Sequence, residues 1–314
     1  MFAWYQKAEV CIAYLSDVRG PNAVFSGSVL EQFRFSRWFE RGWTLQELIA
    51  PAEVLFVDAQ WRYFGKKTST LSPAPDPFIR LLSEVSRIPV EVLTHRQSFR
   101  DYSVAQRMSW ASTRSTTREE DAAYCLLGLF SINMPLLYGE GSKAFRRLQH
   151  IILGEDLGES IFAWRPRASS MQMFDLFASS PAEFANSADI VDFMRPEGPI
   201  LTRRGVGIEL RVPWAPQTSI YGCEDDSYLL LRLSCGRVVT TDGTPHFATR
   251  VMRLQQALGY EYYHRSDSFY DDKEIAEDED PDDDRFVPLR ESRTLMILPS
   301  RPRMSHYTAR ALYE

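Results

Sequence analysis

Two apolar runs on either side of a helical stretch constrain the fold of this chain more than any other feature. Residues 8–18 and 51–61 are rich in β-branched and aromatic side chains with almost no polar alternation, which is typical of strands buried on both faces. Between them, a helical segment is expected from about Val29 onward. Strand, helix and strand make a βαβ unit, which predicts parallel pairing through a right-handed crossover. The fold class is therefore α/β, and because two strands are too few for a stable sheet, either other segments complete it or the sequence begins partway into a larger domain.

The rest of the sequence divides at about residue 154. Helical spacing of apolar residues predicts four helices, over residues 77–87, 103–113, 118–131 and 142–153. Farther along, apolar residues alternate strictly over 206–212 and 229–235, which predicts half-buried antiparallel strands. We therefore expect an α/β domain with a helical extension over residues 1–153 and a mostly β second domain over residues 154–314.

The negative charge of the chain is concentrated in one acidic run. Residues 271–284 hold ten acidic residues and one lysine, a local charge of −9, so the remainder of this chain of net charge −6 carries +3. We interpret the run as a solvated acidic loop, because it lacks the spaced glycine of a calcium-binding loop. Nothing in the sequence is basic enough to predict a nucleic-acid surface.

Cysteine spacing and the lengths of the apolar runs indicate the cellular compartment of the protein. The four cysteines form no Cys-x-x-Cys pair and the five histidines are scattered, so we expect reduced core thiols and no metal site. The first residues lack the basic and apolar segments of a signal peptide. No apolar run reaches the roughly 20 residues that a membrane-spanning helix needs. These features predict a cytoplasmic protein without a membrane span.

A carboxylate with two competing interpretations lies in residues 36–51. Thr44 and Glu47 have the spacing of a capping box, in which Glu47 only fixes the start of a helix. Trp43 and Glu47 are four residues apart, so the indole and the carboxylate lie on one helical stripe. An indole partly desolvates a neighbouring carboxylate, and this raises a carboxyl pKa and suits the group to acid–base chemistry. From the residues alone, the capping interpretation is favoured.

A second candidate site is a pair of arginines. Arg107 and Arg114 are seven residues apart with Trp110 between them, so one helix face could present two guanidinium groups and an indole. Such a face can hold a phosphate or a pyrophosphate. The alternative, which the residues favour, is that these arginines and Arg118 pair with the acidic residues at 119–121.

A third, weaker candidate is the glycine pair before the last predicted helix. Gly139 and Gly141 precede that helix, and Lys143 lies in its first turn. Free amides at a helix start attract anions. The spacing does not match a phosphate-binding loop, so an ordinary loop is favoured.

Four segments resemble the signature blocks of the fungal heterokaryon incompatibility (HET) domain, in the order of that family. They read Arg41-Gly-Trp-Thr-Leu-Gln-Glu-Leu-Ile-Ala-Pro51, Arg107-Met-Ser-Trp-Ala-Ser112, Thr117-Arg-Glu-Glu-Asp-Ala-Ala-Tyr-Cys-Leu-Leu-Gly128 and Met134-Pro-Leu-Leu-Tyr-Gly-Glu-Gly141. The resemblance implies a role in non-self recognition between fungal cells, with this domain as the effector of programmed cell death. It also implies protein partners or self-association.

HET domains distantly resemble TIR domains, in which a Trp-Cys-Leu-x-Glu-Leu segment supplies the glutamate that cleaves the nicotinamide bond of NAD. Trp43-Thr-Leu-Gln-Glu47-Leu is similar to that segment except for Thr44 in place of cysteine. The resemblance therefore implies a partial TIR-like or flavodoxin-like parallel sheet. It implies that Glu47 is catalytic, that Arg41 and Trp43 line the pocket, and that NAD is the substrate with no cofactor required.

Two alternatives to this chemistry remain open at the level of sequence. The first is a non-catalytic module in the same biology, which signals by self-association of the helical region over residues 103–153. The second is an inactive truncated remnant, since members of the family usually carry upstream residues that supply the first two strands of the sheet.

Overall fold

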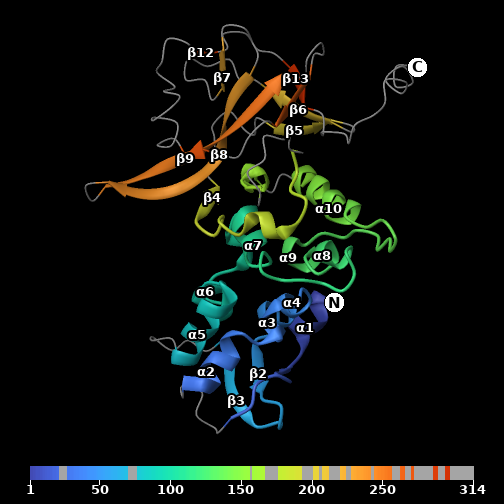
Figure 1. Ribbon diagram of the computed structural model, residues 1–314, viewed down its shortest axis with the longest axis vertical. Helices are drawn as coiled ribbons and strands as arrows, with labels where there is room; N and C mark the ends of the chain where they lie inside the picture. Colours follow the sequence, from blue (N-terminus) through green and yellow to red (C-terminus); the bar gives the residue numbers. More distant parts are fainter. Residues whose placement is uncertain are drawn as a thin grey trace. The chain divides into compact units, whose positions relative to one another are not determined.

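The computed structural model describes residues 1–20, 27–69, 76–155, 158–166 and 176–192, and beyond them the strands between residues 201 and 297 (Figure 1). The chain divides into two compact units. The first comprises Met1–Arg165 and Ser179–Asp192, and the second comprises Pro166–Ala178 and Phe193–Glu314. The domain boundary at residues 153/154 stays a prediction, because compact units do not define the extent of a sequence family.

A three-stranded sheet lies at one end of the first unit. Its strands are β1 (Cys11–Tyr14), β2 (Glu53–Val57) and β3 (Tyr63–Thr68), in the order β1-β2-β3. β1 and β2 are parallel, and β3 is antiparallel to β2. The structure thus confirms the α/β fold class and the parallel pairing, and it adds a third strand that the sequence did not predict.

Among the described residues, one face of this sheet is covered much more completely than the other. Val54 and Phe56 are completely buried, whereas Ile12, on the opposite face of β1, is 53% exposed. The expectation that both strands are buried on both faces was therefore wrong. The reason is that the cluster of buried aromatic rings lies on one side: the centroid of the Phe33 ring lies 5.0 Å from that of Phe64 and 6.0 Å from that of Phe56.

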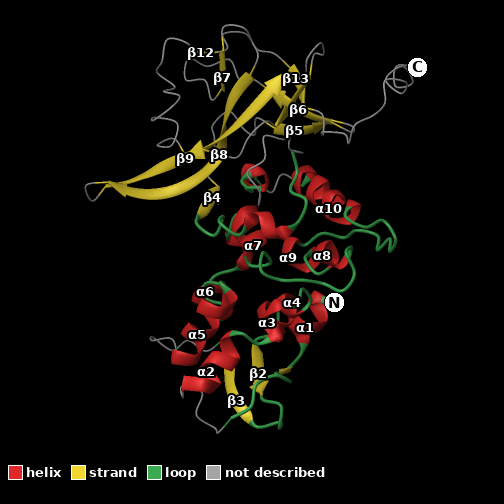
Figure 2. Ribbon diagram, in the orientation of Figure 1, coloured by secondary structure: helices red, strands yellow, loops and turns green. Residues whose placement is uncertain are grey.

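Most of the helices of the first unit are short (Figure 2). They are α1 (Phe2–Lys7), α2 (Gly27–Arg34), α3 (Arg37–Glu40), α4 (Thr44–Ile49), α5 (Pro77–Ser86), α6 (Val90–Leu93), α7 (Val104–Ser109), α8 (Asp121–Tyr124), α9 (Leu127–Phe130) and α10 (Lys143–Gly154). The predicted helices at 77–87 and 142–153 are confirmed by α5 and α10. The helix predicted at 103–113 ends at Ser109, and the one at 118–131 is broken into α8 and α9. Serine side chains contribute to the early end of α7, because Ser109 and Ser112 donate hydrogen bonds to nearby backbone carbonyls.

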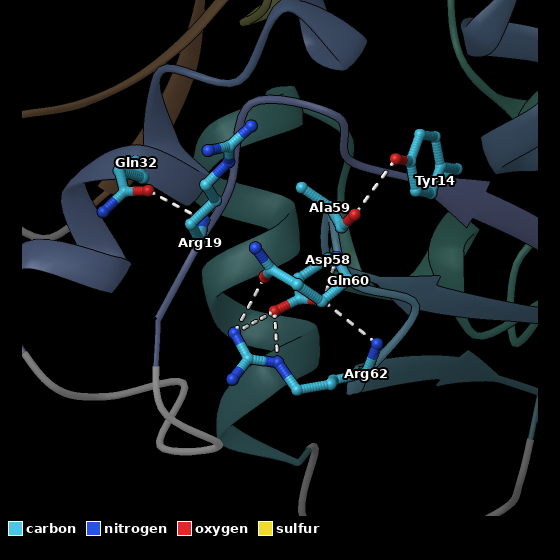
Figure 3. A network of polar contacts seen from close by, with 7 residues as sticks. All are labelled: Tyr14, Arg19, Gln32, Asp58, Ala59, Gln60 and Arg62. Atoms are coloured by element: carbon cyan, nitrogen blue, oxygen red, sulfur yellow. Dashed lines mark hydrogen bonds and ion pairs between the residues drawn. The ribbon is translucent and has the colours of Figure 1, made fainter.

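The turn between β2 and β3 is fixed by one buried carboxylate (Figure 3). Asp58 accepts hydrogen bonds from the amides of Gln60 and Arg62, at 2.8 and 3.0 Å, and from the Arg62 guanidinium at 2.6 and 2.9 Å. The Tyr14 hydroxyl donates to the Ala59 carbonyl at 3.2 Å. This network holds the intervening Trp61 in the left-handed region, at φ 61°.

The second unit is built from strands. They are β5 (Leu201–Arg204), β6 (Gly207–Arg211), β7 (Ile220–Cys223), β8 (Tyr228–Thr241), β9 (Thr244–Gln256), β10 (Tyr262–Arg265), β11 (Tyr270–Asp271), β12 (Phe286–Pro288) and β13 (Thr294–Ile297). Their order is β12-β7-β8-β9-β10-β13-β6-β5, with β11 paired to β9. Most pairs are antiparallel, and β6 and β8 confirm the strands predicted from the alternations at 206–212 and 229–235. The acidic loop at 271–284 lies outside the described residues, apart from Asp271 in β11.

Candidate functional site

The helix α4 carries Glu47, and it begins without the predicted capping box. The Thr44 hydroxyl donates to the carbonyls of Trp38, at 2.6 Å, and Arg41, at 2.8 Å, and no side chain caps the helix start. The favoured capping interpretation was therefore wrong. The reason is that α3 immediately precedes α4 and brings two backbone carbonyls within reach of the hydroxyl.

Glu47 instead contacts a residue from the beginning of the chain. Its side chain is half-buried, and the Tyr5 hydroxyl donates a hydrogen bond to Oε1 of Glu47 at 3.2 Å. Burial and the charge of Glu47 raise the pKa of Tyr5 to about 12. Sequence reasoning missed Tyr5, because no local pattern links residues that are 42 positions apart.

A buried lysine lies at the other end of α4. Lys67 is 0% exposed, and its Nζ donates to the carbonyl oxygens of Pro51, at 2.5 Å, and Ile49, at 3.3 Å. Nε2 of His95 lies 3.3 Å from that Nζ and 2.9 Å from the Ile49 oxygen. Burial lowers the pKa of Lys67 to about 7. Burial, together with Lys67, lowers the pKa of His95 as well.

Cys11 lies on the covered face of the sheet, in the same row as Lys67. Cys11 in β1 is opposite Val54, which is opposite Lys67 in β3. Burial and the charge of Glu47 raise the pKa of the Cys11 thiol, while Lys67 opposes the shift. We call Tyr5, Cys11, Glu47 and Lys67 the α4 polar cluster. The cluster brings four ionisable groups from α1, α4, β1 and β3 into electrostatic contact.

Arg41, Trp43 and Arg114 are brought together at the start of α4. Arg41 is exposed and forms a parallel bridge with Ser115, and Trp43 is half-buried directly before the helix. Nη1 of Arg114 donates to the Arg41 carbonyl at 2.9 Å and to the Thr44 hydroxyl at 2.8 Å. Burial lowers the pKa of Arg114 to about 10, and the charge of Glu47 acts in the opposite direction. These three residues therefore lie together at the start of the helix that carries Glu47.

Arg107 is held elsewhere, inside the helical part of the first unit. It is 5% exposed, donates to the Leu129 carbonyl at 3.1 Å and lies 4.6 Å from the centroid of the Phe130 ring. Burial lowers its pKa to about 10. Arg107 and Arg114 do not share a helix face, because α7 ends between them. Within the described part of the chain, neither arginine forms an ion pair with the acidic residues at 119–121.

The glycine pair before α10 does bind an anion, but the anion belongs to the chain itself. The amides of Gly139 and Gly141 donate to Oε1 of Glu120 at 2.7 and 3.1 Å. Hydrogen bonds from backbone amides lower the pKa of Glu120, although burial acts in the opposite direction. Glu120 directly precedes α8, but its side chain does not cap that helix.

No group of three His, Cys, Asp or Glu side chains among the described residues is arranged to hold a metal ion. None of the helices in the described ranges is long and apolar enough to cross a membrane.

Comparison with known proteins gives one informative relative. Over 161 residues the chain is 42% identical to the vegetative incompatibility protein HET-E-1 of Podospora anserina. The match covers 50% of this chain and 11% of that protein, so the chain spans only about a tenth of the length of the relative. No family model matches the sequence, and no solved structure matches the chain.

Proposed function

We propose that this chain acts in fungal vegetative incompatibility, as a cytoplasmic effector of cell death in non-self recognition. The observation that carries the proposal is the 42% identity to HET-E-1, which extends over half of the chain. The four sequence blocks at 41–51, 107–112, 117–128 and 134–141 support the same role, since they resemble those of the HET domain.

We infer further that Glu47 promotes hydrolysis of the nicotinamide bond of NAD, in which nicotinamide leaves and water takes its place on the ribose. A carboxylate stabilises the positive charge that develops on a ribose ring as its leaving group departs, as in glycoside hydrolysis. The geometry supports this role because Glu47 is half-buried, receives a hydrogen bond from Tyr5 and is free of the helix cap. Arg41 and Trp43 flank the same helix and would contact the substrate. Arg107 has no part in this proposal, because its guanidinium is enclosed by Leu129 and Phe130.

Induced expression in a filamentous fungus tests the role and the chemistry separately. The full chain, Glu47→Gln and Glu40→Gln are expressed at equal levels, and death is scored with a vital stain. Glu47→Gln is nearly isosteric, and Glu40 is an exposed glutamate seven residues upstream. We expect death with the wild type and with Glu40→Gln, and survival with Glu47→Gln. Survival with the wild type would contradict the incompatibility role, whereas death with Glu47→Gln would contradict only the catalytic one.

A second candidate function is non-catalytic signalling by self-association, and one surface favours it. Leu136 and Leu137, in the loop before α10, are each 53% exposed. The loop is held in place, because the Leu137 amide donates to the Tyr124 hydroxyl at 2.7 Å and Arg118 lies 4.7 Å from the centroid of the Tyr138 ring. Contiguous exposed apolar side chains often mark protein interfaces. On this hypothesis, replacing both leucines with serine abolishes killing and oligomer formation in light scattering, whereas Glu47→Gln changes neither.

A further inference from the structure

The helix α1 is attached to the rest of the first unit through few groups. None of its residues is buried, and Trp4 is 78% exposed. Phe2 makes an edge contact with Phe99, at 5.4 Å between ring centroids. It also fills the space beside Gly128 in α9, where an added Cβ would lie 2.3 Å from the Cβ of Phe2. The absence of a side chain at residue 128 therefore lets α1 approach α9.

Tyr5 follows Phe2 by three residues, so both side chains lie on one side of α1. While Phe2 contacts α9, the hydroxyl of Tyr5 reaches Oε1 of Glu47 at 3.2 Å. The contact joins residues that are 42 positions apart, so it depends on where α1 is placed and not on the local chain. The placement of α1 by Phe2 thus sets the position of the phenol relative to the carboxylate.

We propose that Tyr5 is a positioning residue that orients the carboxylate of Glu47 for the reaction, an inference that rests on the proposed function. One hydrogen bond to Oε1 restricts rotation of the carboxylate and leaves its second oxygen for the reacting ribose. The phenol serves this purpose at every physiological pH, because a tyrosine whose pKa is raised to about 12 remains a protonated donor.

The contact itself is tested by nuclear magnetic resonance, without any activity measurement. Full-length protein is labelled with ¹³C at the ζ carbon of tyrosine, and the Tyr5 signal is assigned as the one missing from Tyr5→Phe. The ζ carbon bears the phenol oxygen, so its signal reports on the acceptor of the hydroxyl, and Glu47→Gln replaces a carboxylate acceptor with a weaker neutral amide. We expect the Tyr5 signal to shift in Glu47→Gln relative to the wild type and to stay in place in Glu40→Gln. An unchanged Tyr5 signal in Glu47→Gln would overturn the proposal.

The positioning role is tested by steady-state kinetics of NAD cleavage. Tyr5→Phe keeps the ring and removes only the donor, so we expect kcat to fall on the order of 10- to 100-fold with KM unchanged. An unchanged kcat would overturn the positioning role. So would a fall in kcat/KM that comes from a higher KM alone. If the wild type releases no nicotinamide, the proposed NAD chemistry fails and the positioning role fails with it, whereas the contact is still decided by the resonance measurement.

A glycine substitution moves the phenol without changing either partner. Gly128→Ala places a methyl group where Phe2 now lies, so α1 must shift and carry Tyr5 away from Glu47. We expect it to lower kcat, as Tyr5→Phe does, and to shift the Tyr5 signal away from its wild-type position. Gly154→Ala is the matched control, because the space around Gly154 is open, and it should leave both readouts unchanged. Normal kcat in Gly128→Ala with a displaced Tyr5 signal would contradict the proposal.

Discussion

Lys67 makes the stability of the first unit depend on pH in a way that one substitution removes. Its ammonium group is enclosed between the carbonyls of Pro51 and Ile49, and burial lowers its pKa to about 7. In the unfolded chain a lysine keeps its proton up to about pH 10.4. Between these two values the unfolded state binds more protons than the folded state. The free energy of unfolding contributed by Lys67 therefore rises with pH from about 7 and levels off above about 10.

The magnitude follows from the two pKa values. At pH 7 about half of the folded molecules carry the charged lysine, and at pH 9 almost none do, while the unfolded chain remains charged. Integration over this interval gives an increase of about 2 kcal/mol in the free energy of unfolding. The half-buried thiol of Cys11 and the buried thiol of Cys125 act in the opposite direction. Their pKa values are raised, so above about pH 8.5 the unfolded state loses these protons first and the free energy of unfolding falls. The wild type alone therefore does not isolate the lysine.

The assay compares variants at each pH. Urea unfolding of the wild type, Lys67→Met and Lys66→Met is followed by tryptophan fluorescence at pH 7, 8 and 9. Six of the seven tryptophans lie in Met1–Arg165, so the signal reports mainly on the first unit. From pH 7 to pH 9, we expect the free energy of unfolding of the wild type to rise by about 2 kcal/mol relative to that of Lys67→Met. Lys66 is an exposed neighbour, so the difference in the free energy of unfolding between the wild type and Lys66→Met should stay constant over this pH range. A constant difference for Lys67→Met as well would refute the reasoning.

Three further substitutions test local features of the first unit by urea or thermal unfolding. Arg87→Gly should raise the free energy of unfolding by up to about 1 kcal/mol, because Arg87 ends α5 at φ 60°, which favours glycine; a loss of stability would contradict this. Asp58→Ala should lower it by about 2 kcal/mol, since it leaves the Arg62 guanidinium and two turn amides without their acceptor; a neutral effect would show that water replaces the carboxylate. Gly65→Ala should cost about 1–3 kcal/mol, because the added Cβ would lie 2.7 Å from the Phe78 ring, and a stable variant would mean that the ring can move.

The parts of the fold that could be predicted from sequence are those with a local periodic signal. The apolar run around Val54 to Val57 and the helical spacing over residues 77–87 and 142–153 identified β2, α5 and α10. β3 gave no such signal, because it contains Gly65 and a buried lysine, Lys67, at inward positions. The inward lysine is explained only by the carbonyls of Ile49 and Pro51, which the folded chain brings to it.

The site was predicted less completely, because its contacts join distant segments. The helix that carries Glu47 was predicted correctly, but the spacing of Thr44 and Glu47 wrongly indicated a cap. The competing carbonyls come from Trp38 and Arg41, and no propensity rule reports them. Tyr5 was missed because its contact with Glu47 also joins distant segments, and the short helix α1 has no buried residue that would indicate a packed face.

One measurement decides whether Glu47 is a catalytic group. The purified chain, Glu47→Gln and Glu40→Gln are each incubated with NAD, and released nicotinamide is quantified by chromatography over time. The proposal predicts steady release by the wild type and by Glu40→Gln, and no release above the protein-free control by Glu47→Gln. Equal release by the wild type and Glu47→Gln, or none by the wild type, would contradict it.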